Sequence, residues 1–223
     1  GSALARINGA GGNGVAPEAT LLFIKTDFFF TSLERGIRYA ADHGADVISM
    51  SLGAYSDSFY DGFDDWQSGD SETATYLQSA IDYAYNKDCV IVAAAGNELT
   101  SHKSYPACNN HVIGVGALAK NSSTTASYYS NYNASSSRPG DNVNVDVAVT
   151  GTVYAPNFDK KTGDSSGYQE TNGTSFACPI TAGAIALYRS KYPEASNAQV
   201  EQALFASCDD IGDAGWDAKY GYG

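Results

Sequence analysis

The sequence is short of positive charge and contains no long apolar run. Its 223 residues include 13 lysines and arginines against 25 aspartates and glutamates, a formal net charge of -12 at pH 7. Nucleic acids and anionic membrane surfaces attract basic proteins, so this balance predicts neither as a partner. No apolar stretch approaches the roughly 20 residues that a membrane-spanning helix needs, which again predicts no membrane partner.

Cysteine is also scarce and is not paired in the sequence. The four cysteines, Cys89, Cys108, Cys178 and Cys208, show no C-x-x-C spacing. Structural zinc sites commonly use such pairs, so no zinc site is predicted. Free, buried thiols are the expected state. A disulfide between Cys89 and Cys108 is the alternative, because both lie near the starts of predicted strands that can be neighbours.

Apolar runs rich in β-branched residues alternate with stretches of helical period. Strands are predicted at residues 20–26, 47–51, 90–94, 112–117 and 143–148, and helices at 33–41, 77–84, 175–191 and 200–205. Such alternation is typical of a parallel sheet with helices on both faces. We therefore expect one α/β domain over residues 1–223, with any ligand site at the carboxyl ends of the strands.

Residues 173–179, Gly-Thr-Ser-Phe-Ala-Cys-Pro, run directly into an apolar helix pattern. This places Ser175 in the first turn of a buried helix, where free amides supply positive potential to a developing oxyanion. A serine at a helix start is most often only an N-cap, which is the structural alternative. Two buried strands, ending in Ser51-Leu52-Gly53 and Ala94-Ala95-Gly96-Asn97, favour the chemical interpretation because all three motifs converge at one sheet edge.

These three blocks, in this order, resemble the subtilisin-like serine proteases, the subtilases. Fainter matches at Tyr105-Pro106-Ala107, Ser130-Asn131-Tyr132 and the terminal Gly221-Tyr222-Gly223 extend the resemblance over nearly the whole chain. The resemblance implies a subtilisin-like three-layer fold and a serine endopeptidase that forms an acyl-enzyme at Ser175. It also implies that the Asn97 side chain and the Ser175 backbone N–H stabilise the oxyanion.

The resemblance also shows what the chain does not contain. A subtilase triad runs Asp, His, Ser, and its first two members lie upstream of the element matched by residues 14–17. His43, His102 and His111 are the only histidines, and none sits in a His-Gly-Thr setting. We therefore expect a peptidase domain incomplete at both ends. It should be nearly inactive alone and completed by an upstream companion chain or propeptide.

The resemblance assigns substrate contacts to several strand ends. One groove edge is assigned to Ser51, Leu52 and Gly53, against which an extended peptide adds by backbone pairing. The opposite edge and an apolar subsite are assigned to Phe28, Phe29, Phe30 and Leu33. The pocket for the residue before the scissile bond is assigned to Ala94, Ala95, Gly96, Ser104 and Tyr105, with a cis peptide at Tyr105-Pro106.

Residues 55–72 follow the Gly53 strand as an insertion that carries six acidic side chains among aromatic ones. The segment is predicted to be a surface excursion beside the substrate groove. It is interpreted either as a solvated loop or as an acidic rim that favours basic peptides. A calcium-ordered loop is a third interpretation, so calcium stays open as a cofactor, although no residue is assigned to a metal.

Two other functions stay open. A peptide-binding module without catalysis would result if the upstream Asp or His were never present. An acid peptidase of the sedolisin type shares the Gly-Thr-Ser motif but uses an oxyanion Asp, which Asn97 disfavours. Abundant Tyr, Ser, Asn and Gly with few Lys favours a secreted or cell-surface protein.

Overall fold

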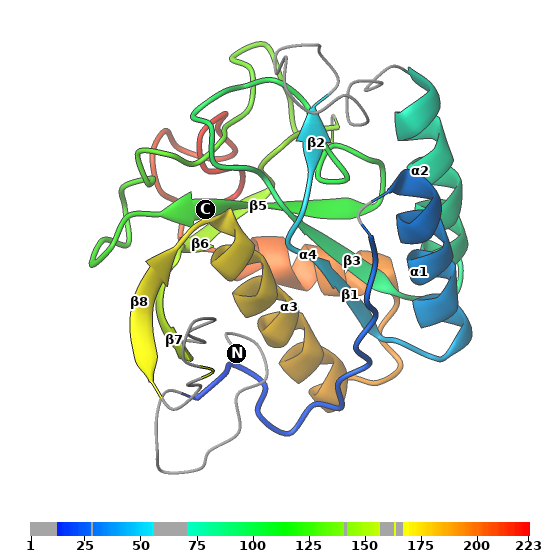
Figure 1. Cartoon of the computed structure of the whole chain (residues 1–223). Helices are drawn as coiled ribbons and strands as arrows, with labels where there is room; N and C mark the ends of the chain where they lie inside the picture. The colour runs from blue at the N-terminus through cyan, green and yellow to red at the C-terminus, as the bar shows by residue number, and fades with distance from the viewer. Residues whose placement is uncertain (1–12, 28, 56–70, 141, 157–162, 164–166) are drawn as a thin grey trace.

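A parallel sheet forms the centre of the molecule (Figure 1). The computed structural model describes residues 13–27, 29–55, 71–140, 142–156, 163 and 167–223. The sheet has the order β1 (Val47–Met50), β3 (Val90–Ala94), β5 (Val112–Leu118) and β6 (Val147–Thr150), and each neighbouring pair is parallel. The carboxyl ends of these strands therefore meet at one edge, as the sequence predicts.

Helices cover both faces of this sheet (Figure 1). On one face, α1 (Phe30–Asp42) and α2 (Ser71–Tyr85) pack on Ile91 and Ala93 of β3. On the other face, α3 (Thr174–Lys191) and α4 (Asn197–Ala206) pack on Val90 and Val92 of the same strand. Alternate residues of β3 thus enter different cores, which explains its uninterrupted apolar run. The predicted three-layer α/β fold is confirmed.

The strand predicted at residues 20–26 is wrong. This stretch is extended but pairs with no strand among the described residues, and Leu21 and Phe23 are 64% and 80% exposed. Its Ile24 and Thr26 side chains face α1 close to Gly36. A β-strand exists only through hydrogen bonds to a neighbour, and β1, the edge strand of the sheet, is not that neighbour.

The last predicted strand begins later than its apolar pattern indicates. Residues 143–148 were expected to be extended, whereas β6 begins at Val147. At Val145, the Asn133 side chain makes the hydrogen bonds that a neighbouring strand would otherwise make. Its amide oxygen accepts from the Val145 N–H, and its amide nitrogen donates to the Val145 carbonyl. A buried side chain therefore satisfies backbone groups that the prediction assigned to a ladder.

Two small antiparallel pairs were not predicted. β2 (Ala54–Tyr55) pairs with β4 (Ser104–Tyr105), and β7 (Thr152–Pro156) pairs with β8 (Tyr168–Asn172). The second pair leads directly into α3, so the hairpin lies next to the start of that helix in the chain. Both pairs lie outside the central sheet.

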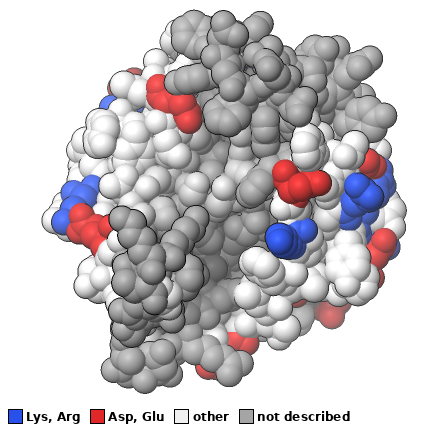
Figure 2. All heavy atoms as spheres, in the orientation of Figure 1, with Lys and Arg blue, Asp and Glu red and all other residues white. Residues whose placement is uncertain are grey.

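The surface and the thiols agree with the composition. All four cysteines are free, and Cys89, Cys108 and Cys178 are buried, so the alternative of a disulfide is wrong. On the face shown in Figure 2, basic and acidic side chains lie in small mixed groups. One ion pair of the described residues joins Arg38 and Glu34 within α1, at 3.0 Å. Within the described residues, no helix is long and apolar enough to span a membrane.

A buried carboxyl predicts a dependence of stability on pH. Asp146 is partly buried just before β6, and its carboxylate accepts the Gly114 N–H at 2.8 Å. Burial raises the pKa of Asp146 to about 7, against an ordinary value near 3.8. Between these values the folded chain retains a proton that the unfolded chain has lost. The folded state should therefore lose stability as the pH rises from about 4 to 7, by at most ~4 kcal/mol.

The substitution Asp146→Asn should remove this dependence because the amide does not ionise. Denaturant unfolding of both chains at pH 5, 6, 7 and 8 measures the difference. The wild-type chain should lose stability relative to the variant over this range. Parallel pH profiles for the two chains would show that Asp146 ionises normally.

Candidate functional site

Ser175 lies in the first turn of α3, at the edge where the parallel strands end. The residue is half-buried. In the described part of the chain, neither its hydroxyl nor its backbone N–H has a hydrogen-bond partner. A free N–H at a helix start carries positive potential, and a free hydroxyl can meet a substrate. The predicted nucleophile is therefore not an N-cap.

Asn97 meets the start of α3 through Thr174. The Asn97 Oδ1 accepts the Thr174 N–H at 2.8 Å and the Thr174 hydroxyl at 3.1 Å. The Thr174 hydroxyl oxygen also accepts the Gly96 N–H at 3.1 Å. These contacts engage the oxygen of the Asn97 amide and leave its Nδ2 without a partner among the described residues. Asn97 thus keeps a free donor beside the Ser175 turn.

Thr174 was not predicted as a site residue. From the sequence it was considered only as part of the serine motif, although it is fully buried and determines which end of the Asn97 amide is free. Its position directly before the predicted nucleophile was the one sequence feature that pointed to a role in the site. No periodic pattern, however, distinguishes such a threonine from one that only packs in the core.

Gly173 allows Asn97 to approach the helix start. Its φ of 145° lies in a region that side-chain-bearing residues rarely adopt. A Cβ at this position would lie 3.6 Å from Asn97 Oδ1 and 3.8 Å from its Nδ2, so the amide packs directly on Gly173. The glycine of the serine motif therefore serves both the turn into α3 and the placement of Asn97.

Asn131 holds the loop that carries Asn97. Its side-chain oxygen accepts the N–H groups of Glu98 and Thr100, and its Nδ2 donates to the Ala95 carbonyl at 2.9 Å. Its own N–H donates to the Gly96 carbonyl at 3.1 Å. Asn131 is only 1% exposed, so these bonds form out of water and fix the loop on both sides of Asn97. In the sequence, Asn131 was noted only as part of a faint family match.

Two of the predicted groove segments lie side by side. β2, which follows Gly53, pairs with β4, which consists of Ser104 and Tyr105. A Cβ on Gly53 would lie 2.8 Å from the Ser104 hydroxyl. The two segments are therefore too close at this point for a side chain on residue 53. Ala94 and Ala95 are buried at the end of β3, and the Tyr105-Pro106 peptide is cis.

The opposite predicted edge differs from the expectation. Phe28 lies outside the described residues. Phe29 is extended, but α1 begins at Phe30, so Phe30 cannot continue an extended edge. Next to this start, the Asp27 carboxylate accepts from the Phe29 N–H and the Ser32 hydroxyl. Leu33 is 4% exposed and belongs to the core.

None of the three histidines, all of them among the described residues, forms a hydrogen bond to Ser175. His43 ends α1 and His111 directly precedes β5, so both lie toward the amino ends of the strands, away from Ser175. His102 is exposed in the loop after β3, and its carbonyl accepts from the buried Asn144 amide. Cys178 is fully buried, and burial raises the pKa of its thiol to about 11, which excludes it as a thiolate nucleophile.

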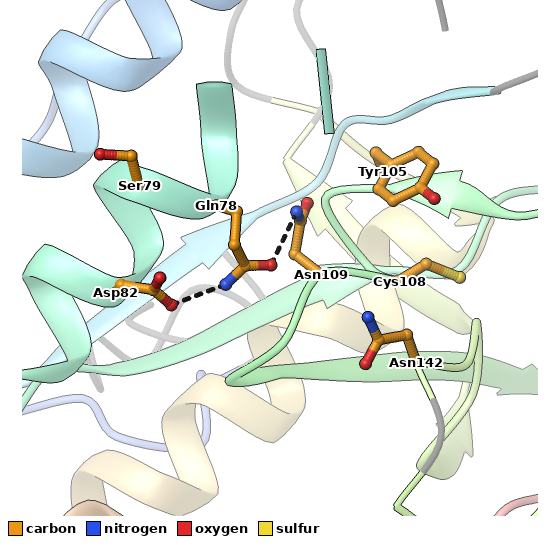
Figure 3. Close-up of a pocket in the computed structure, with 7 residues that line it drawn as sticks. All are labelled: Gln78, Ser79, Asp82, Tyr105, Cys108, Asn109 and Asn142. Atoms are coloured by element: carbon orange, nitrogen blue, oxygen red, sulfur yellow. Dashed lines mark hydrogen bonds between the residues drawn. The ribbon is translucent and has the colours of Figure 1, made fainter. Parts of the chain in front are cut away.

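A cavity of about 450 Å³ lies beside the β4 segment and is shown in Figure 3. Its polar lining is held together by Gln78, which donates to Asp82 at 2.7 Å and accepts from Asn109 at 3.1 Å. Tyr105 is its one residue in common with the predicted substrate contacts. Among the described residues, no group of acidic, histidine or cysteine side chains could hold a metal ion. Residues 56–70, with most of the acidic insertion, lie outside the description.

A larger cavity of about 990 Å³ runs along β1. Its walls are the extended residues 19–26, residues 45–52 around β1, one face of α1, and α3 residues that include Ala182, Ala186 and Arg189. One end of the cavity reaches Ser51 and Leu52, where β1 arrives at the site edge. Neither this cavity nor the smaller one includes Ser175 or Asn97 among its lining residues.

Known proteins resemble this chain in sequence. The sequence matches the profile described as the Subtilase family over residues 1–223. The chain belongs to the subtilase family. This subtilase is 35% identical to Subtilisin DY of Bacillus licheniformis, over 96% of this chain and 70% of that protein. It is 33% identical to Thermitase of Thermoactinomyces vulgaris, over 93% of this chain and 64% of that protein.

Solved structures extend the likeness to the fold. The subtilase chain superimposes on S41 Psychrophilic Protease with a TM-score of 0.76 and 29% identity, covering all of this chain and 74% of that one. Sphericase gives a TM-score of 0.75 with 27% identity and the same coverage. The chain therefore spans about two thirds to three quarters of the length of these relatives.

Proposed function

We propose that this subtilase chain provides the nucleophile and oxyanion site of a serine endopeptidase. The observation that carries the proposal is the meeting of Ser175 and Asn97 at one sheet edge, joined through Thr174 and each with a free group. The Ser175 hydroxyl gives its proton to the triad His and its oxygen attacks the peptide carbonyl. The peptide C–N bond then breaks, the amine leaves with that proton, and the acyl-enzyme at Ser175 is later hydrolysed by water. The Asn97 Nδ2 and the Ser175 N–H donate to the oxyanion that develops.

The substrate is an extended polypeptide that lies against the Ser51–Gly53 edge. Backbone pairing there gives affinity with little dependence on sequence. In this proposal, the substrate residue before the scissile bond lies between the end of β3 at Ala94–Gly96 and the β4 segment. The pairing of β2 with β4 and the close contact of Gly53 with Ser104 support a position of β4 beside the same groove. Composition supports export of the enzyme to the outside of the cell.

The activating Asp and His belong, in this proposal, to a segment upstream of the described chain. The 990 Å³ cavity supports this location, because it borders an edge strand and the extended residues 19–26. A strand in this cavity could pair with the edge of β1 that has no partner strand among the described residues, and give residues 20–26 a neighbour as well. If it ran parallel to β1, its carboxyl end would lie by Ser51, close to the Ser175 turn.

A buried polar atom at the cavity wall fits a polypeptide occupant. Arg189 lines the cavity, is 7% exposed and donates to Asp88 and Asn197 through its terminal nitrogens. Its Nε, however, has no partner among the described residues. A carbonyl of an inserted chain could accept from this group, which otherwise lacks the hydrogen bond that buried donors require. We therefore propose that residues 1–223 are one part of a single peptidase domain.

Asn97→Ala tests the oxyanion assignment. In the chain supplied with its upstream segment, we expect turnover to fall by about 100- to 1,000-fold while KM changes little, because the donor acts on the transition state. That range is known for subtilisin itself, so it is carried over from a family member. Steady-state hydrolysis of a chromogenic peptide gives both constants.

The matched control is Asn110→Ala, because Asn110 is exposed on the loop before β5. This control should hydrolyse the peptide like the wild type. An Asn97→Ala variant with unchanged turnover would remove Asn97 from the oxyanion site. A peptide-binding module without catalysis would show no turnover in any of the three proteins.

A further inference from the structure

The carbonyl group of Ser175 lacks its normal partner inside α3. In a regular α-helix the carbonyl of residue 175 accepts the N–H of residue 179. Residue 179 is proline and lies inside the helix, so this N–H does not exist. The first turn of α3, which carries the proposed nucleophile, is therefore held by one hydrogen bond fewer than an ordinary turn.

A side chain from another element takes the place of the missing donor. The Ser51 hydroxyl donates to the Ser175 carbonyl at 2.8 Å. Ser51 follows β1 directly, and 124 residues separate the two partners in the sequence. Its backbone belongs to the predicted substrate edge, whereas its side chain contacts the backbone of the nucleophile. The bond thus links the substrate edge to the Ser175 turn.

We propose that Ser51 is a positioning residue, which acts through the Ser175 carbonyl that Pro179 leaves free. The hydroxyl fixes the first turn of α3 relative to the strand end against which the substrate lies. This role rests on the proposed function, because it concerns the distance between the Ser175 hydroxyl and a bound peptide. Reacting groups lose rate steeply with small displacements, whereas backbone pairing of substrate to residue 51 needs no side chain.

The role predicts an unusual pattern of kinetic constants. In the chain with its upstream segment, Ser51→Ala should lower kcat by about 10- to 100-fold and change KM by less than about 3-fold. Ser51→Thr retains the hydroxyl and should restore most of kcat. Ser207→Ala, at the end of α4, is the control and should leave both constants unchanged, because the Ser207 hydroxyl donates to the Leu204 carbonyl of its own helix.

A double-substitution cycle isolates the proposed contact. Pro179→Ala supplies the missing N–H, so the Ser175 carbonyl can bond inside the helix. When it is combined with Pro179→Ala, Ser51→Ala should lower kcat by no more than about 3-fold, against about 10- to 100-fold in the chain that retains Pro179. Equal losses of kcat in the two backgrounds would overturn the proposal, because Ser51 would then act independently of the Ser175 carbonyl.

Melting temperatures of the same four proteins separate this inference from the proposed function. Ser51→Ala should lower the melting temperature by about 2–4 °C when Pro179 is present, and by clearly less in the Pro179→Ala background. If this coupling appears while none of the proteins hydrolyses a peptide, the hydrogen bond is established and the proposed function fails. Hydrolysis by the wild type without coupling in either measurement overturns the inference alone.

Discussion

Replacing Ser175 with alanine should abolish peptide hydrolysis by the subtilase in the presence of its upstream segment. In the proposed mechanism, the Ser175 Oγ is the only atom of the chain that forms a covalent bond to the substrate. No other group can therefore substitute for it. Loss of the nucleophile lowers turnover by about a million-fold in subtilisin itself, a figure carried over from the family. Peptide binding should persist, because the groove edges are intact.

Two measurements on this variant check the expectation. Steady-state hydrolysis should fall about a million-fold, to the residual rate that binding and the oxyanion donors supply. Calorimetric titration with an uncleaved peptide should show unchanged affinity. Ser207→Ala is the control, since Ser207 ends α4 and, among the described residues, bonds only to that helix. Hydrolysis by the Ser175→Ala variant at even a hundredth of the wild-type rate would show that the nucleophile lies elsewhere.

The upstream segment should raise the reactivity of Ser175 at least about 1,000-fold. A serine hydroxyl without a neighbouring base is a weak nucleophile, and the members of a triad act as a unit. Within the described residues, none of His43, His102 and His111 forms a hydrogen bond to Ser175. The rate of labelling by a fluorophosphonate, compared between chain 1–223 alone and the same chain with its upstream segment, measures this effect.

A variant of the upstream segment separates folding from chemistry. The segment with its triad Asp and His changed to alanine should fill the cavity beside β1 and raise the melting temperature, yet leave labelling slow. If this variant restored labelling in full, the base would have to come from the described chain. Rapid labelling of chain 1–223 alone would have the same meaning.

The fold could be predicted where local and global preferences agree. Residues 90–94 form a continuous apolar run because both faces of β3 are buried, and this burial is what the sequence pattern reports. Residues 20–26 have the same kind of pattern, but their state depends on a neighbour. A sequence pattern cannot show whether the strand beside it is present, and here the cavity lies in that position.

The site could be predicted only in part for a related reason. Ser175 and Asn97 stand in motifs at the end or start of an element, and the family resemblance gave each a role. Thr174 and Asn131 act through side-chain bonds to loop backbone, which leave no periodic trace in the sequence. Phe30 was misplaced because it is the first residue of α1, and the run of three phenylalanines does not show where the extended chain ends and the helix begins.

Mapping of the covalent adduct tests the central claim most directly. The chain with its upstream segment is treated with a peptidyl fluorophosphonate, digested and sequenced by mass spectrometry. We predict one modified residue, Ser175, and a labelling rate that falls by about 100-fold or more in Asn97→Ala because the phosphoryl oxygen loses a donor. Modification of another residue, or of Ser175 at a rate that Asn97→Ala does not change, would contradict the proposed mechanism.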